Sequence, residues 1–134
     1  MLVSPLMSQS ARHPDADIVL VEGELEPAEP GQRLLVAPYH IHHNDDEVFY
    51  VLSGHIGFEV GDEEYIAGPG DAVMVPPGAI HNWWNIDPEP ARYLIAMSKK
   101  MDDLIIAIHE RHYNEDEMKA LFDAHDSTYI GWSR

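Results

Sequence analysis

Between Ile18 and Met97 the sequence alternates short apolar runs with turn-forming residues, and this pattern constrains the fold more than any other feature. The runs are IVLVE, RLLVAPY, EVFYVLSG, HIGFEV, AVMVP, HNWWNI and RYLIAM, and Gly, Pro, Asn and Asp separate them. Short apolar runs at such spacing, bounded by turn residues, indicate strands of a sandwich or barrel. We therefore predict one all-β domain, over residues 17–98, that closes on itself.

The segments on either side of this domain have different patterns. Residues 1–16 lack periodicity and contain Ser, Gln and Pro, which predicts a flexible N-terminal lead-in. Residues 99–134 hold two stretches, MDDLIIAIHERH and NEDEMKALFDAH, that place apolar side chains on one helical face. Asp102 and Asp103 favour the start of the first helix, and Asn114 is the expected cap of the second. The apolar face of the second helix consists of Met118, Leu121 and Phe122. We expect a helical extension after the barrel.

Composition narrows the classes of function. The formal net charge is −16, which opposes binding to nucleic acid or to an anionic membrane because Lys and Arg hold those partners. Apolar runs fall short of the roughly 20 residues that span a bilayer, and the N-terminus lacks the features of a secretory signal, so we expect a cytoplasmic protein. The chain has no cysteine, so any metal ion would be held by nitrogen and oxygen.

The segment PYHIHHNDDEVFYVLSG concentrates histidines and acidic residues directly before a strand-like run. Side chains two residues apart share a face on a strand but point to nearly opposite sides of a helix. His40 and His42 can therefore chelate one ion only from a strand. Residues 43–46 are turn formers, which predicts that the chain folds back there and that Glu47 begins the next strand.

Another histidine follows a stiff corner. Pro76, Pro77 and Gly78 form the corner, which aims His81 into the domain at the start of the next strand. Three neutral imidazoles and one carboxylate suit a divalent transition ion such as Fe, Mn, Ni, Co, Cu or Zn. Four protein ligands leave two positions of a six-coordinate ion for substrate, water or dioxygen. Such open positions are typical of a catalytic metal site and not of a structural one.

Two motifs make the sequence similar to the cupin family. The first motif comprises His40, His42, Glu47 and Gly54, with four residues before the Glu and six after it. The second comprises Gly70, Pro76, Gly78, His81 and Asn85, which stand at every fixed position of the family pattern. One position departs from the pattern, because Leu34 stands where the first motif begins with glycine. Gly31 is the glycine that can supply the turn instead.

The resemblance covers about residues 31–97 and implies a cupin-type double-stranded β-helix, or jelly-roll, barrel with a metal ion at its centre. By motif matching it carries the ligand role onto His40, His42, Glu47 and His81. The segment DEVFYVLSG, together with the C-terminal helices, makes the chain resemble most the small single-domain bacterial proteins that are called quercetin-dioxygenase-like.

Three functions remain open from the sequence. The first is a metal-dependent oxygenase that acts on a small neutral or aromatic enol or diol, with Glu47 as ligand or proton acceptor. The second is a redox-neutral isomerase or lyase in which the ion is a Lewis acid. The third is a non-catalytic small-molecule binding module. Only Arg33 and Arg92 lie in the barrel strands, which favours neutral over anionic substrates.

Residues that share a strand face with the ligands are the candidates for a substrate pocket: Phe49, Val51, Trp83 and Asn85. Trp83 fits a pocket wall and a core position equally well, whereas Trp84 faces outward and is expected beneath a helix or in a dimer contact. His43 has the opposite parity and is expected in an exposed loop. Strand edges and two apolar-faced helices predict a homodimer.

Overall fold

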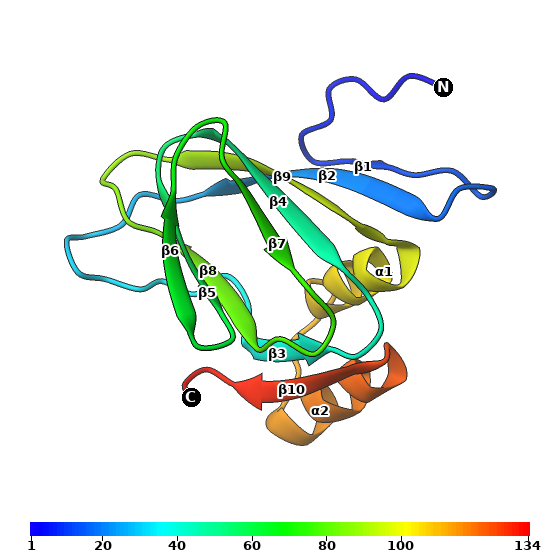
Figure 1. Ribbon diagram of the computed structural model, residues 1–134. Coiled ribbons are helices and arrows are strands. Elements are labelled where there is room, and N and C mark those ends of the chain that lie inside the picture. The colour runs from blue at the N-terminus through cyan, green and yellow to red at the C-terminus, as the bar shows by residue number, and fades with distance from the viewer.

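Two antiparallel sheets face each other in the computed structural model, which describes residues 1–134 (Figure 1). The first sheet has the strand order β1-β2-β9-β4-β7, with bounds Ser10–Ala11, Ile18–Leu25, Ala91–Ser98, Glu47–Ser53 and Ala72–Val75. The second has the order β10-β3-β8-β5-β6, with bounds Ser127–Gly131, Tyr39–His42, His81–Asn85, Ile56–Val60 and Glu63–Ala67. Neighbouring strands come from distant parts of the chain, as in a jelly roll. The predicted all-β barrel is confirmed.

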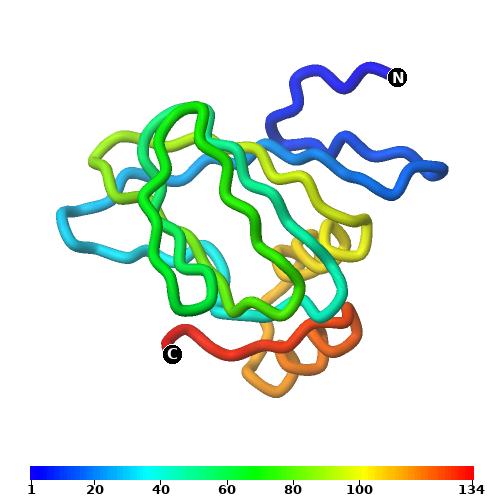
Figure 2. The backbone as a smooth tube through the Cα atoms, viewed as in Figure 1, coloured from blue at the N-terminus to red at the C-terminus, as the bar shows by residue number.

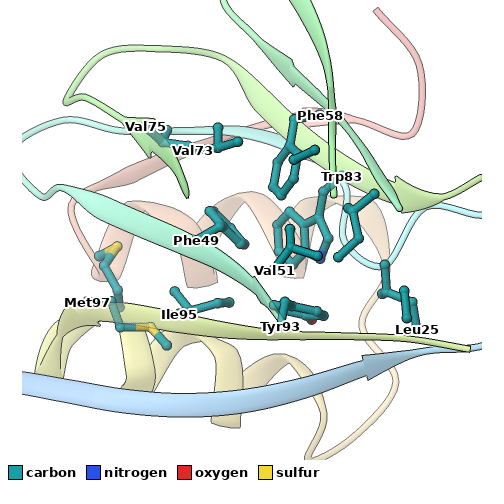
Figure 3. Close-up of a cluster of buried hydrophobic side chains, with 14 of the residues drawn as sticks. Leu25, Phe49, Val51, Phe58, Val73, Val75, Trp83, Tyr93, Ile95 and Met97 are labelled. Carbon is teal, nitrogen blue, oxygen red and sulfur yellow. The ribbon is translucent and has the colours of Figure 1, made fainter. Parts of the chain in front are cut away.

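Inward-facing side chains of both sheets fill the barrel, as Figure 3 shows. Alternation along β4 buries Glu47, Phe49 and Val51 and leaves Tyr50 43% exposed. The ring centroid of Phe49 lies 4.9 Å from that of Trp83 and 5.1 Å from that of Phe58. Each large apolar side chain that is fully buried contributes about 1.5–3 kcal/mol, so this aromatic cluster is a main source of stability.

The expected strand over RLLVAPY is wrong for most of its length. Strand β3 begins only at Tyr39, and residues 33–38 form an irregular segment. The Arg33 guanidinium lies 4.0 Å from the centre of the Trp84 ring, which is only 4% exposed. Trp84 is therefore covered by this segment and not by a helix. Pro38 lacks the amide hydrogen that a strand ladder would use, which is consistent with the late start of β3.

Two helices follow the barrel, as the sequence predicts (Figure 1). Helix α1, Lys99–Ile108, begins before Asp102, because the Ser98 hydroxyl accepts a hydrogen bond from the amide of Met101 and caps the helix. Helix α2, Glu115–Ala124, has the predicted Asn114 cap within a full capping box. Neither helix is long and apolar enough to cross a membrane.

The chain then returns to the barrel, which the helical pattern did not predict. Strand β10 pairs antiparallel with β3, and Figure 2 shows the C-terminal end of the chain running beside that strand. At the other terminus, β1 pairs with β2. Arg12 also contacts the buried Asp102 of α1 at 2.9 Å, so residues 10–12 of the expected lead-in are attached to the body of the protein.

Candidate metal centre

Four side chains from three strands meet at one end of the barrel. His40 and His42 lie on β3, Glu47 begins β4, and His81 begins β8. His40 and His81 are directly opposite each other in the β3–β8 pairing. All four residues are buried, with at most 5% of each exposed. The structure thus brings together the four residues that the two sequence motifs singled out.

Glycines at the corners hold these strands in place. Gly78 has φ +86°, a conformation that L side chains rarely adopt, and its amide donates to the carbonyl of His42 at 2.7 Å. The Pro-Pro-Gly corner is therefore attached to the strand that carries two of the histidines. Gly31 also has a positive φ, of +77°, and supplies the turn that Leu34 does not make.

The facing atoms of the three histidines lie close together, and Glu47 approaches two of them. The Nε2 atom of His42 lies 3.0 Å from Oε1 of Glu47, and Nε2 of His81 lies 3.4 Å from Oε2. One ligand atom from each of His40, His42 and His81 lies within 4.8 Å of the others. Metal–nitrogen bonds of about 2.1 Å at right angles would place neighbouring ligand atoms about 3 Å apart, close to the two observed distances.

Hydrogen bonds on the far side of each ring orient the histidines. Nδ1 of His40 lies 2.6 Å from the carbonyl of Pro38, and Nδ1 of His81 lies 3.0 Å from the carbonyl of Ala79. Because a carbonyl only accepts, each of these Nδ1 atoms carries the hydrogen, and the lone pair of the neutral ring is on Nε2. Nδ1 of His42 lies 2.8 Å from the hydroxyl of Ser127.

Three buried atoms at the centre lack a hydrogen-bond partner within the protein: Nε2 of His42, Nε2 of His81 and Oε2 of Glu47. A buried polar group without a partner costs about 1–3 kcal/mol, so three in one place form a costly arrangement unless something binds there. A divalent transition ion would supply that partner, and its preference for imidazole and carboxylate donors fits this set. His40, His42 and His81 could therefore hold a metal ion.

Electrostatics favour the protonation states that bind a cation. Burial and the neighbouring His81 and His42 hold the pKa of His40 well below its usual value, which keeps the ring neutral. Burial by itself would raise the pKa of Glu47, but the adjacent His42 and His81 side chains outweigh burial and lower that pKa below its usual value. The carboxylate is therefore ionised at neutral pH.

The four candidate pocket residues have two different environments. Phe49, Val51 and Trp83 belong to the packed hydrophobic core inside the barrel. Asn85 lies further along β8, where its amide donates to the carbonyls of Glu26 and Glu89 and its oxygen accepts from the amide of Asp87. These contacts connect the loops at the far end of the barrel. His43 is exposed, as predicted.

The C-terminal extension contributes residues that the sequence did not mark as functional. Phe122 of α2 is fully buried with its ring beside His40, and Met101 of α1 is fully buried near Ser127. Ser127 itself bonds to His42 across 85 positions of sequence. Nothing in the local pattern around a single serine predicts such a contact.

Comparison with known families identifies the class of protein. Residues 29–97, which are 69 of the 134 residues, match the family described as "Cupin domain". The chain belongs to the cupin family. No curated protein matches it.

Solved structures share this fold. A Thermus thermophilus protein, TT1209, is 32% identical, with a TM-score of 0.52 over 61% of this chain and 72% of the other. A putative sugar phosphate isomerase from Acidithiobacillus ferrooxidans is 27% identical, with a TM-score of 0.54 over 63% of this chain; the match spans about half, 51%, of that protein. KdgF from a Halomonas species, 23% identical with a TM-score of 0.54 over 66% of this chain and 75% of the other, shows the fold alone.

Proposed function

We propose that this protein is a metal-dependent cupin enzyme, an oxygenase that acts on a small neutral or aromatic enol or diol. The observation that carries the proposal is the set of unpartnered buried atoms on His42, His81 and Glu47, which converge beside an aromatic core. In this proposal His40, His42, Glu47 and His81 hold one divalent ion. The fold is common to enzymes and binding modules, and the converging groups of the site are what favour an enzyme.

The residues of the chain have separate roles in this reaction. When bound, the ion supplies Lewis acidity and, if it is redox-active, electron transfer to dioxygen. Glu47 is ionised, and its Oε2 atom is free to accept the proton of an enol or phenol hydroxyl. The buried apolar residues around the site exclude water, which strengthens electrostatic interactions there.

The positions of the arginines support a neutral substrate. Arg33 stacks on the outward-facing Trp84 and pairs with Glu64. Arg92 pairs with Glu22 at 2.5 Å on the outer side of the first sheet. Neither guanidinium faces the four converging groups, so a phosphate or dicarboxylate at the site would lack the bidentate partner that such anions usually have.

A redox-neutral isomerase or lyase is the second candidate. It is favoured by the similarity to the Acidithiobacillus ferrooxidans protein that is named a putative sugar phosphate isomerase. In that reaction the ion would act only as a Lewis acid, and Glu47 would move a proton between neighbouring carbons. The two candidates differ in whether dioxygen is consumed.

Oxygen uptake distinguishes the oxygenase from the redox-neutral isomerase or lyase. Protein stripped of metal and then loaded with Fe(II), Mn(II) or Ni(II) is mixed with a panel of enols, diols and flavonols, and oxygen consumption is recorded. We expect uptake that is lost in Glu47→Gln and retained in Glu24→Gln, which changes an exposed carboxylate on β2. Turnover of a sugar phosphate without oxygen would contradict the oxygenase, and so would tight ligand binding without turnover.

We also propose that the protein forms a homodimer. The outer side of the first sheet exposes three large apolar side chains: Ile18 at 73%, Tyr50 at 43% and Met74 at 56%. A second copy could cover these three side chains, and burial of exposed apolar surface favours association. Light scattering should give twice the 15.1 kDa mass of the chain, and Met74→Glu should lower it.

A further inference from the structure

The C-terminal strand makes a direct contact with a candidate metal ligand. Ser127 is 1% exposed, and it stands opposite His42 in the β10–β3 pairing. Its hydroxyl oxygen lies 2.8 Å from Nδ1 of His42. Ser127 lies outside residues 29–97, which match the cupin domain, so this contact comes from a part of the chain that the family match does not include.

The direction of this hydrogen bond follows from the other partner of the hydroxyl. The Ser127 oxygen lies 3.1 Å from the carbonyl of His125, which can only accept, so the single hydroxyl hydrogen is donated there. The only further contact of the hydroxyl is a weak one of 4.0 Å to the sulfur of Met101. We therefore assign the lone pair that faces His42 as the acceptor, which places the ring hydrogen on Nδ1 of His42.

This arrangement leaves the Nε2 lone pair of His42 directed at Glu47 and His81. His40 and His81 obtain the same tautomer locally, from the carbonyls of Pro38 and Ala79, each two residues earlier. His42 obtains it from a residue 85 positions later. Of the three candidate histidine ligands, His42 is therefore the one whose tautomer depends on the position of β10.

Three contacts hold β10 in that place. The turn between α2 and β10 contains Asp126, whose carbonyl accepts from the amide of His43 at 3.1 Å and whose carboxylate accepts from the amide group of Asn44 at 2.6 Å. Thr128 bonds to the ring of His43 at 2.7 Å. These contacts attach β10 to the turn between His42 and Glu47, which joins two of the ligand strands.

We propose that Ser127 is a positioning residue of the metal centre, and that the C-terminal extension completes the centre by holding His42 in the tautomer that binds an ion. The inference rests on the proposed metal site. Removal of a hydrogen-bond partner behind a metal-binding histidine typically lowers metal affinity about 10–100-fold, so the effect is measurable.

The test compares Ser127→Ala with Ser127→Thr, which restores the hydroxyl, and with Ser133→Ala, which removes an exposed hydroxyl beyond the end of β10. Affinity for Co(II) and Zn(II) is measured by competition with a chelator. We expect a 10–100-fold loss in Ser127→Ala, recovery in Ser127→Thr and no change in Ser133→Ala. Equal affinity in Ser127→Ala and the unchanged protein would overturn the proposal.

A second measurement distinguishes positioning from packing. Nitrogen NMR of the metal-free protein, labelled in its histidines, reports which ring nitrogen of His42 carries the hydrogen. We expect Nδ1–H in the unchanged protein and a mixture of tautomers in Ser127→Ala; an unchanged tautomer would contradict a positioning role. If the protein bound no divalent ion but the tautomer still changed, the metal site would be wrong and the role of Ser127 in orienting His42 would stand.

Discussion

The ring of Phe122 lies beside the imidazole of His40, with ring centroids 5.4 Å apart and planes at 64°. Phe122 comes from α2 and His40 from β3, so the helical extension forms an apolar cover on one side of the candidate metal site. Phe122 is fully buried although its helix is mostly exposed. This contact makes the extension part of the structure around the site.

Replacing Phe122 should test that cover. Phe122→Ala removes a fully buried ring and is expected to lower the free energy of unfolding by about 3–5 kcal/mol. Leu121→Ala, at a partly exposed position of the same helix, should have a clearly smaller effect. Urea unfolding followed by tryptophan fluorescence measures both. Equal losses of unfolding free energy in the two variants would mean that the contact between Phe122 and His40 adds nothing to stability.

Metal removal should lower stability if the four groups bind an ion. An ion at 100 times its dissociation constant stabilises the folded state by about 2.7 kcal/mol, so Zn(II) should raise the melting temperature of stripped protein and a chelator should reverse the rise. His81→Ala should abolish this response because it removes one of the buried unpartnered atoms. The matched control, His112→Ala, changes an exposed histidine and should respond as the unchanged protein does.

Two glycines in left-handed turns should differ in their tolerance of alanine. Gly54 has φ +78°, and a Cβ atom there would lie 2.9 Å from the Cβ and 3.0 Å from the Cα of Ala91, whereas Gly61 has φ +61° and open space around it. Gly61→Ala should cost only the conformational term of about 1–2 kcal/mol, and Gly54→Ala should cost more because backbone must also move. Thermal unfolding of the two variants compares them, and a Gly61→Ala that is the less stable would refute the steric argument.

The attachment of the N-terminal segment depends on Asp102. Its buried carboxylate accepts from the Ser10 hydroxyl at 3.1 Å and from Arg12 at 2.9 Å, whereas the half-exposed Asp103 contacts Arg12 alone. Asp102→Ala should cost about 1–3 kcal/mol and release residues 1–12, because the partly exposed Ser10 and Arg12 lose their shared charged acceptor. Limited proteolysis should then cleave the N-terminal segment faster than in Asp103→Ala. Similar rates in the two variants would show that other contacts hold the segment.

Local patterns were sufficient for most of the barrel and for the candidate ligands. Strand alternation placed Glu47, Phe49 and Trp83 on the inner face, and the corner at Gly78 aimed His81 inward. Alternation fixes which face a side chain takes but not whether that face borders a cavity or a packed core. The packing of Phe49 against Trp83 therefore became known only from the arrangement of both sheets.

By itself the sequence determined the identity of the converging groups and the corners that direct them, because spacing along a strand and the φ preference of glycine act over a few residues. The tertiary structure alone decided that residues 33–38 lie over Trp84, that β10 joins the second sheet, and that Ser127 bonds to His42. Those contacts join residues that are distant along the chain. They depend on which surfaces remain to be covered once the barrel has closed, and no short stretch of sequence contains that information.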